Sequence, residues 1–318
     1  MSFSKAAIID LGTNTFHLLI VELLEQQHFR TVYKEKIPVK LGEGGISKNI
    51  LSEAAMKRGL HTLQHFAQLL AAEEVTHLQV FGTSALRNAR NSGDFLLQVR
   101  QRFGFDIQII DGDTEALLIY EGIRLSGALK GERALMMDIG GGSVEFIIGS
   151  EERVDWKQSF EIGGQRLMDR FHQPEARLLP SEQQDLHCYL QEALLPLAEA
   201  IQHYQPKRLV GASGTFDTLH DMDRAAAAKG QPHKREKYLT HALPLERYQK
   251  MAKKILESDR EARLQLPGMI PMRADMIVVA ICLIDHILTL LPEAPITCTS
   301  YALKEGAVAR IFNSTLIS

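Results

Sequence analysis

An internal repeat is the feature that most constrains how this chain can fold. Residues 6–20 read A-A-I-I-D-L-G-T-N-T-F-H-L-L-I and align without gaps with residues 134–148, A-L-M-M-D-I-G-G-G-S-V-E-F-I-I, at an offset of 138 minus 10, or 128. Each copy combines an apolar strand, a turn with Asp and Gly, a hydroxyl residue and a second apolar strand. Solenoid repeats have much shorter periods, so two copies this far apart predict two related domains that face one another.

Strand patterns alternate with helix patterns around the first copy. Ser52 is the predicted N-cap of a long helix, because apolar residues recur after it at three- and four-residue steps. Further helices are predicted over 93–103 and 114–124. Strands are predicted over 5–10, 16–24, 29–41, 78–81 and 107–110. This alternation is typical of an α/β fold.

A glycine-containing segment at 122–131 separates the two copies and is predicted to be a hinge. It divides the chain into a domain of residues 1–124 and a domain of residues 125–318. The last helix, about 302–318, could pack back on the first domain. Within the second domain we expect a long helix at 181–204, a strand that enters a small-residue turn at 209–215, a polar loop or short helix at 224–237, and helices near 244–257, 273–291 and 302–312.

Composition excludes several classes of protein. The chain has 318 residues, 45% of them hydrophobic, which suits a globular protein with room for two domains. A formal net charge of -3 leaves no broad basic face for nucleic acid, and three scattered cysteines argue against a disulfide framework or zinc site. No secretory signal is visible, and Asp285 and His286 interrupt the most apolar run, at 276–291. We therefore expect a cytoplasmic protein that binds neither nucleic acid nor a membrane.

The three glycines at 140–142 need an explanation, because glycine weakens a strand. They could form the bend of a hairpin, where glycine supplies positive φ. Alternatively, backbone without side chains can aim several N–H groups into one concavity that binds phosphate oxygens. On this second hypothesis, residues 140–143 form one cradle and residues 12–15 form the opposing one. Two such turns at equivalent positions favour the second explanation.

Carboxylates at the ends of apolar strands predict a cation. Asp10 and Asp138 occupy such positions, where an unpaired carboxylate is costly to bury. Glu145 lies two residues beyond Ser143 and therefore on the same strand face, so Asp138 and Glu145 could share a Mg²⁺ ion with phosphate oxygens of a ligand. The alternative is a salt bridge from these carboxylates to a nearby Lys or Arg.

An arginine and a glutamate complete the set of candidate residues. Arg87 follows a strand and a pair of hydroxyl residues, so it could hold phosphate bidentately, or form an ordinary surface pair with an acidic residue. Glu115 lies in the first turn of a predicted helix, where glutamates usually complement the helix dipole. His61 and His65 have the spacing of two metal ligands on a helix, but without a matching carboxylate motif we interpret them as solvated.

Seven motifs together resemble the exopolyphosphatase and guanosine pentaphosphate phosphohydrolase family, in the superfamily of actin, sugar kinases and heat-shock chaperones. They are I-D-L-G-T-N-T-F-H at 9–17, G-T-S-A-L-R-N-A at 82–89, G-D-T-E-A at 112–116, D-I-G-G-G-S-V-E at 138–145, G-A-S-G-T at 211–215, R-A-D at 273–275 and A-L-K-E-G at 302–306. The resemblance implies two actin-like, ribonuclease H-like α/β domains with mixed five-stranded sheets facing an interdomain cleft.

The resemblance also implies roles for individual residues. Glu115 corresponds to the base that activates water, with Arg87 beside it in the catalytic set, and Asp138 and Glu145 correspond to ligands of Mg²⁺ or another divalent cation. The implied phosphate-binding residues are Asp10, Gly12, Thr13, Asn14, Thr15, Arg87, Gly140, Gly141, Gly142, Ser143, Gly214 and Thr215.

The activity implied by the resemblance is hydrolysis of an acid anhydride. The enzyme would release terminal orthophosphate from inorganic polyphosphate or from guanosine pentaphosphate, an alarmone of the stringent response, and the resemblance is compatible with a homodimer. Two alternatives stay open. One is a catalytically silent regulator that binds alarmone or polyphosphate, and the other is an ATP-dependent kinase of the same superfamily.

Overall fold

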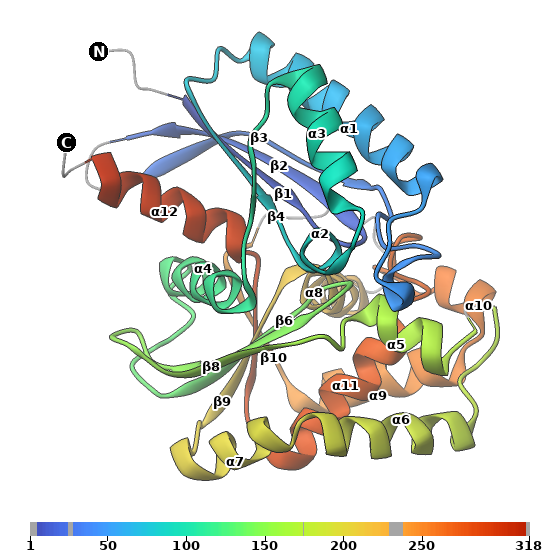
Figure 1. Ribbon diagram of the computed structural model, residues 1–318. Helices are drawn as coiled ribbons and strands as arrows, with labels where there is room; N and C mark the ends of the chain where they lie inside the picture. Colours follow the sequence, from blue (N-terminus) through green and yellow to red (C-terminus); the bar gives the residue numbers. More distant parts are fainter. Residues whose placement is uncertain (1–4, 25–27, 174, 229–237, 316–318) are drawn as a thin grey trace. The chain divides into compact units, whose positions relative to one another are not determined.

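The computed structural model describes residues 5–24, 28–173, 175–228 and 238–315, which form two compact units (Figure 1). Within the described residues, the first unit comprises those up to Gly122, the short segment Gly140–Gly142, and those from Leu303 onward. The second unit comprises Ile123–Ile139 and Ser143–Ala302. Each unit has a mixed β-sheet of its own.

The sheet of the first unit has the strand order β3-β2-β1-β4-β5. Its strands are β1 (Lys5–Leu11), β2 (Thr15–Leu23), β3 (Phe29–Pro38), β4 (His77–Gly82) and β5 (Ile107–Ile109). Strand β2 is antiparallel to β1 and β3, whereas β1, β4 and β5 run parallel. Strand β1 is apolar at nearly every position because both of its faces are buried.

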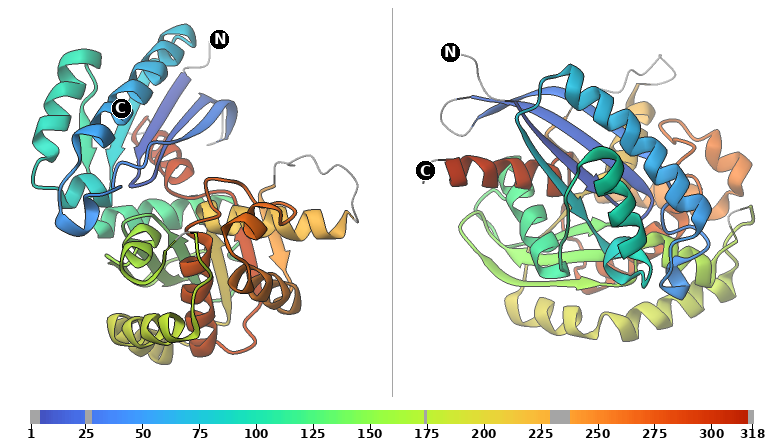
Figure 2. Two further views of the ribbon diagram at one scale, coloured as in Figure 1. Left: turned by 90° about the vertical axis from the view of Figure 1, so that its right-hand side faces the viewer. Right: turned by 45° about the horizontal axis from the view of Figure 1, so that its top comes forward.

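Helices cover the sheet of the first unit on both faces, as the views in Figures 1 and 2 show. On one face, α1 (Glu53–Ala72) and α3 (Ser92–Phe103) share a core with alternate residues of β1, including Ile9. On the other, α12 (Leu303–Thr315) contacts β1. The remaining elements are η1 (Ile46–Lys48), α2 (Ser84–Asn88) and α4 (Gly112–Leu125), the last of which ends just past the boundary of the unit.

The sheet of the second unit has six strands, in the order β10-β11-β9-β6-β7-β8, rather than the five expected. They are β6 (Ala134–Ile139), β7 (Val144–Gly149), β8 (Val154–Phe160), β9 (Arg208–Ala212), β10 (Thr240–Leu243) and β11 (Ile296–Thr299). The additional strand, β10, has four residues at the edge of the sheet and pairs only with β11 in the described sheet. Such a short segment has too little periodicity to be recognised in the sequence.

The two sheets share one topology, as the sequence repeat predicted. Without β10, the order β11-β9-β6-β7-β8 repeats β5-β4-β1-β2-β3, and the parallel and antiparallel pairings match one by one. The register matches as well, because Asp10 is opposite His17 in the first unit and Asp138 is opposite Glu145 in the second. The repeat therefore extends from the turn to the whole sheet.

Seven helices are described in the second unit: α5 (Gly164–Phe171), α6 (Pro180–Ala193), α7 (Leu195–Tyr204), α8 (Ser213–Ala227), α9 (Leu245–Glu257), α10 (Arg260–Leu264) and α11 (Ile277–Leu290). Helix α11 is apolar almost throughout, and α5, α6 and α9 pack against it. The chain thus buries its most hydrophobic helix in the core of this unit. No helix of the described residues is long and apolar enough to cross a membrane.

Three expectations about the second unit need correction. The single helix expected over 181–204 is two helices, because Pro196 lies in the first turn of α7, where a missing N–H is tolerated, and the chain breaks at Leu194. The turn expected at 209–215 is the start of α8, which follows β9 directly with Ser213 at a φ of 71°. The polar segment expected at 224–237 begins inside α8, and residues 229–237 lie outside the described part.

The predicted N-cap of α1 provides a test of the local structure. The Ser52 hydroxyl accepts a hydrogen bond from the backbone N–H of Ala55 at 3.2 Å. We expect Ser52→Ala to destabilise the first unit by about 1 kcal/mol, since loss of a serine cap typically costs that much. Urea unfolding followed by circular dichroism measures the effect. The exposed Ser181, in the first turn of α6, provides the control Ser181→Ala. Equal stability of the two variants would contradict the assigned cap.

Candidate active site

The candidate site of the first unit lies where parallel strands end. Because β1, β4 and β5 run parallel, the segments that follow Leu11, Gly82 and Ile109 leave the sheet at the same edge. Ligands of α/β proteins usually bind at this edge, outside the carboxyl ends of the strands. The segments there are the turn at 12–14, the start of α2 and the start of α4.

Backbone hydrogen bonds fix the turn after β1. Gly12 N donates to Thr15 O at 3.2 Å. From the loop after β3, Gly42 N donates to Thr13 O at 2.9 Å and Lys40 N donates to Asn14 O at 2.8 Å. A Cβ on Gly12 would lie 2.9 Å from Thr15 O, so the turn requires glycine there. Thr13 is 3% exposed, and its Oγ1 has no hydrogen-bond partner among the described residues. This hydroxyl is a buried polar group that a ligand oxygen could satisfy.

The glycine turn at 140–142 belongs to the first unit and packs against the turn after β1. A Cβ on Gly141 would lie 2.9 Å from Asn14 Cγ, and a Cβ on Gly142 would meet the hydroxyls of Thr13 and Ser84. Neither these glycines nor Gly140 has a positive φ. Residues 140–142 do form the bend between the antiparallel strands β6 and β7, but the positive φ that the hairpin explanation assumed is absent. Close approach of neighbouring groups is what excludes side chains at Gly141 and Gly142.

Arg87 and Glu115 form a direct ion pair. Arg87 on α2 donates from Nη1 to Glu115 Oε2 at 2.9 Å and to the carbonyl oxygen of Ile110 at 3.0 Å. Asp111 caps α4 by accepting from the N–H of Thr114 at 2.7 Å, which places Glu115 in the first turn of the helix. The Glu115 residue is 7% exposed. The surface pair considered for Arg87 is therefore a largely buried pair with the predicted base itself.

Asp10 lies next to the last residue of β1 and is electrostatically strained. Burial raises the pKa of Asp10 from 3.8 to about 6, the positive charge of Lys304 acts in the opposite direction, and Glu305 raises it further. Lys304 and Glu305 are both buried in the first turn of α12. Glu305 Oε1 forms an ion pair with Lys34 Nζ at 3.0 Å. The ionised form of Asp10 is therefore destabilised near neutral pH.

In the second unit, two carboxylates stand opposite each other on neighbouring strands. Asp138 on β6 is the cross-strand partner of Glu145 on β7, and Glu145 is in turn the partner of Ser159 on β8. The Ser159 hydroxyl donates to Glu145 Oε1 at 2.7 Å. Asp138 and Glu145 are 7% and 1% exposed, and directly opposed side chains share one face of a sheet.

This pair of carboxylates fits a Mg²⁺ ion. Mg²⁺ is usually bound by one or two carboxylates together with water and substrate phosphates, rather than by a cage of protein ligands. Asp138 and Glu145 would be the two protein carboxylates of such a site. Two like charges side by side on a buried face favour a cation between them.

A buried arginine is also part of this region of the second unit. Arg273 is 7% exposed; burial lowers its pKa, while the charges of Asp217 and Asp138 act in the opposite direction. The salt bridge considered as an alternative for Asp138 therefore has a candidate partner in Arg273. Its guanidinium also lies where a Cβ of Gly214 would be, at the start of α8, and Thr215 beside it is 3% exposed. Ser143, at the start of the second unit, is 2% exposed.

Sequence reasoning did not single out Ser84, Ser159 or Arg273 as site residues. Ser84 enters the sequence analysis only as one of the two hydroxyl residues before Arg87, and Arg273 only as part of the motif at 273–275. Ser159 carries no local signal, since only the β7–β8 register brings it to Glu145. A strand alignment would have been needed to find it.

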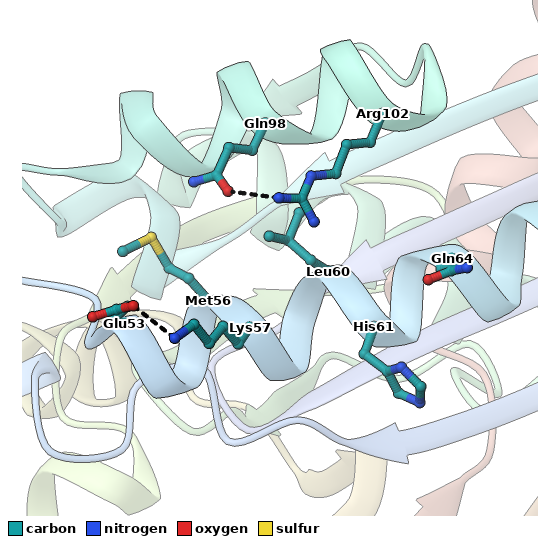
Figure 3. Close-up of a pocket in the computed structure, with 8 residues that line it drawn as sticks. All are labelled: Glu53, Met56, Lys57, Leu60, His61, Gln64, Gln98 and Arg102. Atoms are coloured by element: carbon teal, nitrogen blue, oxygen red, sulfur yellow. Dashed lines mark hydrogen bonds and ion pairs between the residues drawn. The ribbon is translucent and has the colours of Figure 1, made fainter.

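A groove elsewhere in the first unit is separate from these residues. It lies between α1 and α3, with a volume of about 470 Å³, and Figure 3 shows the polar side chains around it. Its lining residues are Glu53, Met56, Lys57, Leu60, His61, Gln64, Gln98 and Arg102, none of which is a predicted site residue. His61 is in this groove, whereas His65 pairs with Glu35 at 2.9 Å. His65 is therefore paired with an acidic residue rather than simply solvated as expected.

Asp10 provides a pH-dependent test of the site. Since its native pKa is raised from 3.8 to about 6, the folded state favours the protonated form, and the contribution of Asp10 to stability is lost as pH rises from about 4 through 6. Asn cannot ionise. We therefore expect Asp10→Asn to be more stable than wild type at pH 8 by roughly 1–2 kcal/mol, a value reduced for partial solvent contact. The difference should vanish near pH 4, and urea unfolding at both pH values measures it. If Asp10→Asn were less stable than wild type at pH 8, the ionised Asp10 would not be destabilising, and this account of the site would be wrong.

Comparisons with known proteins agree with this architecture. Residues 20–315 match the model of the Ppx/GppA phosphatase family. The chain is similar to an exopolyphosphatase from Cytophaga hutchinsonii ATCC 33406, with 41% identity over 98% of both chains and a TM-score of 0.92. It also shares its fold with the Ppx/GppA family member from Aquifex aeolicus, at 21% identity over 98% of this chain and 99% of that chain, with a TM-score of 0.78.

These matches confirm the expected class of fold, two actin-like α/β domains with mixed sheets, apart from the sixth strand of the second sheet. The family match covers nearly the whole chain and includes the described site residues from Arg87 to Thr215. On these grounds, the chain belongs to the Ppx/GppA phosphatase family.

Proposed function

We propose that this protein hydrolyses the terminal phosphoanhydride of inorganic polyphosphate or guanosine pentaphosphate and releases orthophosphate. The single observation that carries the proposal is the ion pair of Arg87 with Glu115, at 2.9 Å, at the edge of the sheet that also carries the turn after β1. Membership of a phosphatase family and similarity to an exopolyphosphatase support the same class of reaction. Both substrates end in a phosphoanhydride, so the shared chemistry is a condensed phosphate chain.

Arg87 is the proposed clamp for the terminal phosphate. Phosphoryl transfer passes through a loose transition state with charge on the peripheral oxygens, so positioning and electrostatic stabilisation supply most of the rate. The guanidinium of Arg87 offers several donors in a fixed fork, while one of its nitrogens already bonds Glu115. A phosphate oxygen would compete for this guanidinium. The hydroxyl of Thr13 and the backbone of the glycine turns would provide further contacts.

Glu115 is the proposed general base. A phosphate group bound to Arg87 would weaken the ion pair between Arg87 and Glu115. The Glu115 carboxylate could then orient a water molecule and accept its proton. The low exposure of Glu115, at 7%, limits competition from bulk water. Asp138 and Glu145 would hold Mg²⁺, which when bound would supply positive charge to phosphate oxygens.

The Arg87–Glu115 pair favours hydrolysis over the two alternatives. A silent regulator needs phosphate contacts, but it gains nothing from a carboxylate beside the clamp, because that carboxylate repels an anionic ligand. A kinase needs a binding site for an acceptor in addition to the clamp. The described residues give no observation that specifies such an acceptor, so we propose water as the nucleophile.

The role of Glu115 is tested by orthophosphate release from polyphosphate, guanosine pentaphosphate and ATP in the presence of Mg²⁺. We expect Glu115→Gln to lower kcat by roughly 10²- to 10⁴-fold on the preferred substrate, since a general base contributes about that much. The matched control is Asp113→Asn, which removes an exposed carboxylate from the same turn of α4. Equal release by Glu115→Gln and wild type would remove Glu115 from the mechanism. Binding without release from any substrate would support the regulator.

The carboxylate pair of the second unit is tested by the metal dependence of the rate. Glu145→Gln keeps an oxygen that can accept from Ser159 but loses the negative charge, so we expect the fold to persist and the Mg²⁺ concentration for half-maximal rate to rise at least about tenfold. Glu152→Gln, at an exposed position after β7, is the control. An unchanged Mg²⁺ dependence in Glu145→Gln would exclude this residue as a ligand.

A further inference from the structure

We propose that Gly306 of α12 is a positioning residue for Glu115. This inference rests on the proposed function, and it assigns a role in the reaction to a residue far from Arg87 and Glu115 in the sequence. The observation behind it is a backbone-to-backbone contact between α12 and α4 within the first unit. Figures 1 and 2 show the two helices side by side in different views.

The contact leaves no room for a side chain on Gly306. A Cβ there would overlap the carbonyl oxygen of Leu118 and would lie 2.9 Å from the backbone nitrogen of Gly122. Both are backbone atoms of α4, so they cannot move away as the tip of a flexible side chain would. Gly306 does not have a positive φ, and close approach is therefore the reason for glycine at this position.

The face of α4 that touches Gly306 is the face that carries Glu115. Glu115, Leu118 and Gly122 are three and four residues apart, which is the spacing of one helical face. Leu118 lies about 4.5 Å along the helix axis from Glu115, less than one turn. If the helix backbone moves at Leu118, the backbone of Glu115 should therefore move by nearly the same distance.

An ion pair with β3 and packing on β1 hold α12 against the sheet, so α4 is the element that must yield. At the start of α12, Glu305 is 1% exposed and pairs with Lys34 of β3 at 3.0 Å. One turn after Gly306, Arg310 Nε donates to both carboxylate oxygens of Glu121, at 3.1 and 3.0 Å, and this pair joins α12 to α4 without fixing α12 to the sheet. Helix α12 also packs on β1, whose residues on both faces are buried. A larger residue at position 306 would thus push α4 away from α12.

The geometry of the Arg87–Glu115 pair makes such a movement measurable in catalysis. A base must lie within hydrogen-bond distance of the proton it accepts, and a misplacement of about 1 Å can cost about 10²-fold in rate. The turn at 12–14 is held by the hydrogen bond of Gly12 with Thr15 and by N–H groups of Lys40 and Gly42, none of which belongs to α4. A shift of α4 should therefore change the rate of the chemical step more than the binding of substrate.

The test uses the full chain with Gly306→Ala, and Gly93→Ala as a control that adds the same methyl group to a helix, α3, where no atom lies within 4 Å of the new Cβ. We expect Gly306→Ala to lower kcat by roughly 10- to 100-fold and to change KM by less than about threefold, with wild-type circular dichroism. The control should keep both constants. Equal loss of activity in the control, or a loss confined to KM, overturns the inference.

A double-mutant cycle separates positioning from general damage. If Gly306 acts through Glu115, adding Gly306→Ala to Glu115→Gln produces no further loss of kcat, because the base is already absent. If the two losses multiply, Gly306 does not act through Glu115.

A crystal structure of Gly306→Ala decides the inference even if the proposed function fails. We expect the contact of Glu115 Oε2 with Arg87 Nη1 to lengthen beyond hydrogen-bond distance. A contact that stays at 2.9 Å overturns the inference, whether or not the wild-type protein releases orthophosphate.

Discussion

The parallel pairing of β1 with β4 and β5 is the constraint on which the candidate site of the first unit depends. It brings the carboxyl ends of three strands, distant in sequence, to one edge of the sheet. Topology therefore makes neighbours of the turn after β1, Arg87 after β4 and Glu115 after β5. Only short segments of chain separate each of them from the end of its strand. Gly141 and Gly142 add a further backbone surface against Thr13 and Asn14.

The two copies of the repeat have the same topology but different chemistry at equivalent positions. The cross-strand pair is Asp10 with His17 in the first unit and Asp138 with Glu145 in the second. Two opposed carboxylates favour a divalent cation, whereas aspartate opposite histidine does not create the same excess of negative charge. Burial instead disfavours the ionised form of Asp10, and the positive charge of Lys304 offsets this effect in part. Strain of this kind is common at functional sites, where stability is given up for activity.

Sequence patterns were reliable where one element had a long period or a strong local signal. Helix α1 begins after its predicted cap, Ser52, and the apolar strands on either side of each turn occur as expected. Short edge strands such as β10 escape such patterns, and Pro196, expected inside one long helix, lies in the first turn of a second helix. The need for glycine at 141 and 142 was recognised, but its reason lies in contacts with Asn14, Thr13 and Ser84, which are more than fifty positions away.

By itself, the sequence determined the repeat, the family and the residue types at both turns, because these are properties of local pattern and of motifs in a fixed order. It could not determine that Arg87 contacts Glu115, that Ser159 supports Glu145, or that Gly306 touches the backbone of Leu118. Each of these contacts joins two elements that are far apart in the sequence, and the sequence separation does not tell how far apart they lie in the fold. Strand register and helix packing decide them, since only the folded backbone fixes which side chains share a face and how closely two helices approach.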